Sequence, residues 1–273
     1  MSVGAPWFDR AAIPITLVLL AALVIGPITP YRKARGIVLW ERLRSPLQVS
    51  AVACAVVAIL GVRSVTVLIA FGLATLIVAA IVRQAHTTAR SRSESYGRAA
   101  AGLYRSDPGY WGGMVSHVGV ALVAVAIAFS GSFDNRETVT IEVGGSADFD
   151  GYTLSYVAPF VSEQEHRTVI GATIALSRGS TDLGSLRPAL TQYPNQVQAI
   201  PTPSVHTGIR EDVYLSLVRI EEGSGQVTLD AYRFPLMWLL WLGGLVVVGG
   251  GALSFVGRRT RQRTALLVET ADV

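Results

Sequence analysis

Five long stretches without a charged residue constrain this chain more than any other feature. Each is close to the roughly 20 residues that an α-helix needs to cross a hydrocarbon core about 30 Å thick. Of the 273 residues, 51% are hydrophobic and only 15% are charged, a composition that is unusual for a soluble globular protein. The chain is therefore predicted to be an integral membrane α-helical protein with five transmembrane helices. The predicted spans are about 11–28, 46–62, 64–82, 109–130 and 234–257.

Basic residues predict the orientation, because Lys and Arg resist translocation across a membrane. Arginines are frequent in segments 29–46 and 83–107 and in the tail 258–273, whereas in 131–233 thirteen acidic residues outnumber seven arginines. We expect a multi-pass protein of the cell (plasma) membrane, with its basic loops and C-terminus in the cytoplasm and 131–233 on the extracytoplasmic side. The net charge of +4 then belongs to the inner loops, so membrane lipid is an expected partner and nucleic acid is not.

Residues 131–233 differ in character from the rest of the chain. Alternating apolar and polar residues predict strands, separated by Gly, Asp, Ser and Pro, at 138–143, 152–156, 168–176, 213–220 and 226–232. The predicted organisation is four transmembrane helices in 1–130, a small extracytoplasmic β domain in 131–233, a fifth helix at 234–257 and a cytoplasmic tail at 258–273. The run Gly249-Gly250-Gly251 in the fifth helix favours close helix packing.

The fourth span contains an ionisable residue, His117, in the stretch GMVSHVGVALVAVAIAFSG. At 1.5 Å per residue it lies roughly 8 Å inside the hydrocarbon core. Such a residue is costly in lipid and should face a partner, a cavity or a cofactor. Residues one or more turns away on the same helix face are all small: Gly113, Ala121, Ala124 and Ala128.

Three interpretations of His117 stay open on the residues alone. It could hydrogen-bond to a neighbouring helix, serve as an axial ligand to a haem iron with the small residues leaving room for the macrocycle, or take part in ion or proton transfer. No other histidine falls within a span, so a bis-histidine haem would need a second ligand from a partner chain. His86, His166 and His206 are expected at the surface, and the single cysteine, Cys54, excludes an internal disulfide.

Several segments resemble CcmF-type cytochrome c haem lyases, in the same order and spacing. They are VGAPWFDRAAIPITLVLLAALVIGPITPYRKAR, WGGMVSHVGVALVAVAIAFSGSF, LRPALTQYPNQVQAIPTPSVHTGIREDVYLSLV and PLMWLLWLGGLVVVGGGAL. The second is similar to the family's Gly-Met-x-x-x-His-Leu-Gly-Val helix. The resemblance covers about residues 3–257 and matches the C-terminal half of such a lyase, a component of system I cytochrome c maturation.

The resemblance implies a function in cytochrome complex assembly. The chain would be a membrane subunit that helps to attach haem covalently to apocytochrome c. His117 would be an axial ligand to a resident haem b, its iron the expected metal, with Gly113, Ala121 and Ala124 as a haem-packing face. Expected partners are an N-terminal CcmF-like subunit carrying the Trp-rich haem-handling segment, other cytochrome c maturation proteins, the haem chaperone and apocytochrome c.

The chain also departs from the family pattern. It has Asp9 where the family usually has Asn, and Arg187-Pro188-Ala189-Leu190 where a Pro-Glu-Lys/Arg-Arg run is usual. Because the family's N-terminal half is missing from the match, we expect a subunit of a holocytochrome c synthase that is incomplete alone, with no catalytic residue assigned. The alternative is a non-catalytic membrane scaffold of the maturation complex without its own haem.

Overall fold

A computed structural model describes residues 5–29, 36–90, 102, 107–133, 135–194, 196, 198–221 and 223–271, with the backbone alone at 5–9, 28 and 258–271. The chain divides into two compact units. The membrane unit comprises Met1–Ser132 and Leu239–Val273, and the β domain comprises Phe133–Trp238.

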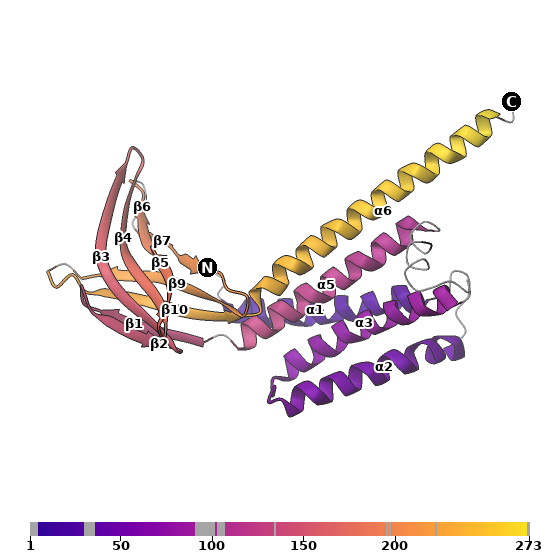
Figure 1. The fold of residues 1–273 in the computed structure, drawn as a ribbon, viewed down its shortest axis with the longest axis horizontal. Helices are drawn as coiled ribbons and strands as arrows, with labels where there is room; N and C mark the ends of the chain where they lie inside the picture. Colours follow the sequence, from indigo (N-terminus) through magenta and orange to yellow (C-terminus); the bar gives the residue numbers. More distant parts are fainter. Residues whose placement is uncertain are drawn as a thin grey trace. The chain divides into compact units, whose positions relative to one another are not determined.

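Five helices are long and apolar enough to cross a membrane within the described ranges, which confirms the predicted fold class. They are α1 (Ala5–Ile28), α2 (Gly36–Ile59), α3 (Val65–Arg90), α5 (Pro108–Ser132) and α6 (Met237–Ala271) (Figure 1).

Four of these helices extend well beyond the predicted spans. Helix α1 begins at Ala5 rather than at 11. Helix α2 begins at Gly36 rather than at 46, α3 continues to Arg90 rather than ending at 82, and α6 continues to Ala271 rather than ending at 257. The limits of each predicted span were set by the uncharged run alone. The absence of charge locates the lipid-facing part, whereas Glu, Gln and Arg are good helix formers and carry the helix into its polar flanks.

Among the described residues, helix α3 of the membrane unit has eight buried side chains. It contacts α1, α2 and α5, and its buried residues include Ala74, Ile77 and Ala80. It forms a tight antiparallel hairpin with α2, as expected, because Gly61 adopts a positive φ of 106° that favours glycine. The small residue Ser50 strengthens this contact by donating a hydrogen bond of 2.7 Å to the carbonyl oxygen of Gly72.

The β domain consists of two antiparallel sheets. Sheet A has the strand order β1-β10-β9-β8, and sheet B has the order β2-β3-β4-β6-β7, with β5 also paired to β4. The strands are β1 (Asn135–Ile141), β2 (Ser146–Phe149), β3 (Tyr152–Gln164), β4 (Arg167–Arg178), β5 (Thr181–Leu186), β6 (Ala189–Gln192), β7 (Ile200–Thr202), β8 (Ser204–His206), β9 (Glu211–Ile220) and β10 (Val227–Pro235).

The core of the β domain lies between the inner faces of the two sheets. Alternate residues of sheet A, such as Leu215 and Leu229, pack with residues of sheet B, such as Phe149, Leu154 and Ile174. All five strands expected from alternation are present, and β3 and β4 are longer than expected. The shorter strands β2, β5, β6, β7 and β8 were not expected, because three to six residues are too few to display a clear alternation.

Candidate functional site

His117 lies in the membrane unit on α5 and is half-buried. Its Nδ1 atom lies 2.8 Å from the carbonyl oxygen of Gly113, one turn earlier on the same helix. A carbonyl oxygen can only accept, so Nδ1 carries the hydrogen and donates it. In the neutral imidazole this leaves a lone pair on Nε2. The hydrogen bond therefore fixes both the tautomer and the direction of the ring.

Nε2 of His117 is directed toward α1. A Cβ atom added at Gly26 would lie 3.6 Å from it. Among the described residues, no hydrogen-bond partner reaches Nε2, so the neighbouring helix does not satisfy the histidine in the way that the first interpretation required. Glycine at position 26 keeps the space beside the lone pair free of a side chain.

The predicted haem-packing face divides into two parts. Gly113 is half-buried, and no atom lies within 4 Å of a Cβ added there. Ala121 and Ala124 are only 1% and 8% exposed, because they pack in the apolar cluster formed with α1 and α3. Gly113 thus lies beside His117 through its carbonyl, whereas the two alanines take part in helix packing. Contact of any of the three with a haem stays a prediction.

A cavity of about 330 Å³ lies farther along the same helices. It is bounded by α1, α3 and α5, and its lining includes Thr16, Ala70, Ala124 and Ala128. The small residues on α5 therefore leave space toward the end of the helix away from Gly113. This lining is mainly apolar, with no charged side chain.

The side chains that could bind a metal ion would fit a haem with one ligand from this chain, His117. In the described ranges, no group of three or more His, Cys, Asp or Glu side chains could hold a metal ion. His86 lies near the end of α3, His166 lies in the β3–β4 turn, and His206 lies on β8. A single imidazole with an oriented Nδ1–H, and with no partner at Nε2 among the described residues, would suit a haem iron.

Helix α6 fixes the helix that carries His117. Ser116 donates a hydrogen bond of 3.0 Å to the carbonyl oxygen of Val247, and Ser254 donates one of 2.9 Å to that of Gly109. A Cβ atom added at Gly250 would lie 2.5 Å from the backbone nitrogen of Ser116. The two backbones are therefore in direct contact, which sets the rotation of α5 about its axis.

This contact confirms the close packing that the glycine run of α6 predicted. The matching small residues on α5 were not predicted to form this contact; they are Gly112, Ser116 and Gly119. Their spacing of four and three residues is a small-residue pattern typical of membrane helix contacts. That signal was present in the sequence.

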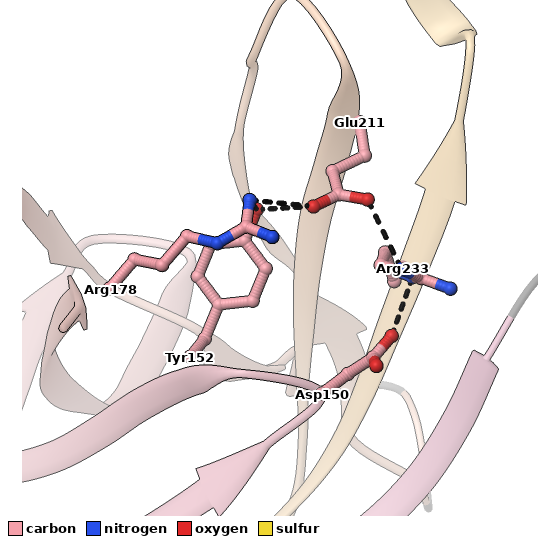
Figure 2. Close-up of polar contacts among 5 residues, drawn as sticks. All are labelled: Asp150, Tyr152, Arg178, Glu211 and Arg233. Atoms are coloured by element: carbon pink, nitrogen blue, oxygen red, sulfur yellow. Dashed lines mark hydrogen bonds and ion pairs between the residues drawn. The ribbon is translucent and has the colours of Figure 1, made fainter.

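The β domain contains a cluster of charged and polar side chains that was not predicted from the sequence (Figure 2). Glu211 at the start of β9 accepts hydrogen bonds from Tyr152 at 2.8 Å, Arg178 at 3.0 Å and Arg233 at 3.3 Å. Arg233 also forms an ion pair of 2.6 Å with Asp150. These residues come from both sheets and are far apart in the sequence, so only the fold brings them together.

The charges of this cluster balance, and its groups are mutually paired. Burial, followed by the hydrogen bond to Glu211, raises the pKa of the Tyr152 phenol above its ordinary value, so the phenol stays a donor. The side chain of Glu211 is 11% exposed. The arrangement is that of an inter-sheet clamp, in which paired side chains join the two sheets.

Comparisons with known proteins identify similar sequences and a similar fold. No family model matches the chain. It is 28% identical to the cytochrome c-type biogenesis protein CcmF of Pseudomonas aeruginosa over 273 residues, covering 99% of this chain and 40% of that protein. It is also 28% identical to the cytochrome c-type biogenesis protein ccl1 of Rhodobacter capsulatus, covering 96% of this chain and 39% of that protein. A solved structure of the cytochrome c haem lyase CcmF has a TM-score of 0.73 and 22% identity, covering 92% of this chain and 40% of that one.

These similarities confirm the resemblance to CcmF-type proteins that the sequence motifs indicated. They extend over nearly the whole chain, and they are consistent with the C-terminal half of CcmF. The chain spans about 40% of the length of the curated relatives that it matches.

Proposed function

We propose that this chain is a membrane subunit of a cytochrome c haem lyase and that His117 is an axial ligand to a resident haem b. The similarity to cytochrome c-type biogenesis proteins supports the first part. The hydrogen bond from Nδ1 of His117 to the Gly113 carbonyl is the observation that carries the second part. It leaves the Nε2 lone pair without a hydrogen-bond partner among the described residues and directed toward Gly26 of α1.

His117 and Gly113 have different roles at this site. Nε2 of His117 would supply the ligand lone pair, and the Gly113 carbonyl orients the ring through the hydrogen bond. Ser116 and Ser254, bonded to α6, hold the helix that carries the ligand. When bound, haem b would supply a one-electron redox centre within the membrane.

The proposed arrangement follows the charge distribution. The basic loops and the C-terminal tail lie in the cytoplasm, and the β domain lies on the extracytoplasmic side. There it meets the other cytochrome c maturation proteins, the haem chaperone and apocytochrome c. An N-terminal CcmF-like subunit supplies the second haem ligand and the Trp-rich segment, because this chain offers one intramembrane histidine.

An optical spectrum tests this proposal. The chain is co-expressed with its N-terminal CcmF-like partner and the complex is purified. We expect a reduced b-type spectrum, and we expect His117→Ala to remove most of it, with partial recovery on adding imidazole. His166→Ala, in an exposed turn of the β domain, is the matched control and should leave the spectrum intact. An unchanged spectrum in His117→Ala would contradict the ligand assignment, and a complex without pigment would favour the scaffold alternative.

A further inference from the structure

The loop between β8 and β9, residues 207–210, exposes a large apolar side chain. Ile209 is 85% exposed, the highest value among the large hydrophobic side chains of the described residues. The loop nevertheless has a defined conformation, because the backbone N–H of Gly208 donates a hydrogen bond of 3.2 Å to the Asp212 carboxylate. Ile209 is therefore an exposed apolar side chain on an ordered loop.

The loop is hydrogen-bonded to the residue that leads into α6. The backbone N–H of Leu236 donates a hydrogen bond of 3.1 Å to the carbonyl oxygen of Arg210, and Pro235 pairs with Glu211 in the β9–β10 ladder. Leu236 directly precedes Met237, the first residue of α6 and of its candidate membrane span, Met237–Gly257. Arg210 is therefore hydrogen-bonded to the residue that directly precedes α6.

The exposed charge of the loop is positive. Arg210 is exposed, whereas the two acidic residues that follow it are not free to oppose it. Glu211 is held by Arg178, Arg233 and Tyr152. Asp212 is buried, and that burial raises the pKa of its carboxyl. The surface at the loop tip therefore combines an apolar side chain with a cation.

We infer that loop 207–210 docks on the lipid surface of the membrane. Ile209 enters the boundary between head groups and acyl chains, and Arg210 contacts lipid phosphate. Apolar side chains next to basic ones are typical of interfacial membrane anchors. Trp238 and Trp241, at the start of α6, are also exposed, and tryptophan is enriched at this depth. The inference concerns the β domain alone and does not depend on the proposed haem site.

Spin labelling measures the depth of the loop directly. Ile209→Cys is made in a Cys54→Ala background, and the labelled full chain, with any co-purifying partner, is placed in nanodiscs of phosphatidylcholine and phosphatidylglycerol. Val161→Cys is the matched control, because Val161 is also apolar and 63% exposed but lies on β3, away from the chain's connections to α5 and α6 in sequence. We expect the label at 209 to be several-fold more accessible to oxygen than to a nickel chelate, and the label at 161 to show the opposite preference.

Two results would overturn the inference. A label at 209 with the aqueous profile of the label at 161 would show that the loop lies in water. A label shielded from both reagents would show that protein covers Ile209. As a second measurement, a photo-crosslinking amino acid at 209 in whole cells should yield lipid adducts. Adducts to protein alone would contradict docking on lipid.

Discussion

At the scale of single residues, Glu211 of the β domain is held by three side chains. One carboxylate accepts from three side chains, and two of these are arginines that come from different sheets. Charges that are largely removed from water are stable only while they stay paired. Replacing Glu211 should therefore lower the unfolding free energy of the β domain more than replacing an exposed acidic residue on the same strand pair.

Replacement of Glu211 tests this clamp. Glu211→Gln removes the charge that balances Arg178 and Arg233, and we expect the β domain to lose about 3 kcal/mol of unfolding free energy. Denaturant unfolding of the purified chain in detergent, followed by the accessibility of a β-domain cysteine, measures the change. The matched control is Glu221→Gln, because Glu221 is 50% exposed and its ion pair with Arg219 is 3.7 Å long. A control loss equal to that of Glu211→Gln would contradict the clamp.

At the scale of elements, the pairing of α5 with α6 determines where the membrane histidine points. Small residues on both helices let the backbones touch, and two serine hydroxyls bridge them. In lipid, such contacts rely on van der Waals packing and on interhelical hydrogen bonds, because the surrounding acyl chains are as apolar as the side chains. Adding one methyl group at the contact should therefore be costly.

The glycine run of α6 allows a controlled test of this contact. Gly250→Ala places a methyl group against Ser116, and we expect a loss of about 1–3 kcal/mol in stability from the forced backbone shift. Gly251→Ala is the matched control, because no atom lies within 4 Å of a Cβ added there. Thermal unfolding in detergent compares the two variants. Equal midpoints would show that the helices do not depend on this contact.

At the scale of the whole molecule, the chain offers one of the two axial ligands that the proposed haem site requires. His117 would supply one ligand under this proposal, and among the described residues no group of three or more His, Cys, Asp or Glu could hold a metal ion. Two relatives that are 28% identical to this chain are more than twice as long as it is.

Expression with and without the partner tests this incompleteness. Purified alone from cells that make excess haem, the chain should show little or none of the low-spin b-type spectrum. Purified with the N-terminal CcmF-like subunit, it should show the full spectrum, because a second axial ligand is then available. A complete bis-histidine spectrum from the chain alone would contradict the need for a partner ligand.

The sequence by itself determined the membrane class, the five helices and the separate β domain. Long uncharged runs, alternation and Gly or Pro turns are local signals, and each reports on the solvent that its own segment meets. The same local signals identified His117 as a polar side chain within a predicted transmembrane helix. They could not set helix ends such as those of α2 and α3, since a helix continues past the lipid boundary.

The tertiary structure decided which residues meet. It directed Nε2 of His117 toward Gly26, placed Ala121 in helix packing, and joined Glu211 to partners from both sheets. It also brought Ile209 beside the start of α6 through the Arg210–Leu236 hydrogen bond. The physical reason is that side-chain direction and long-range pairing depend on helix rotation and strand register. Both are set by contacts between distant segments, and no local pattern records them.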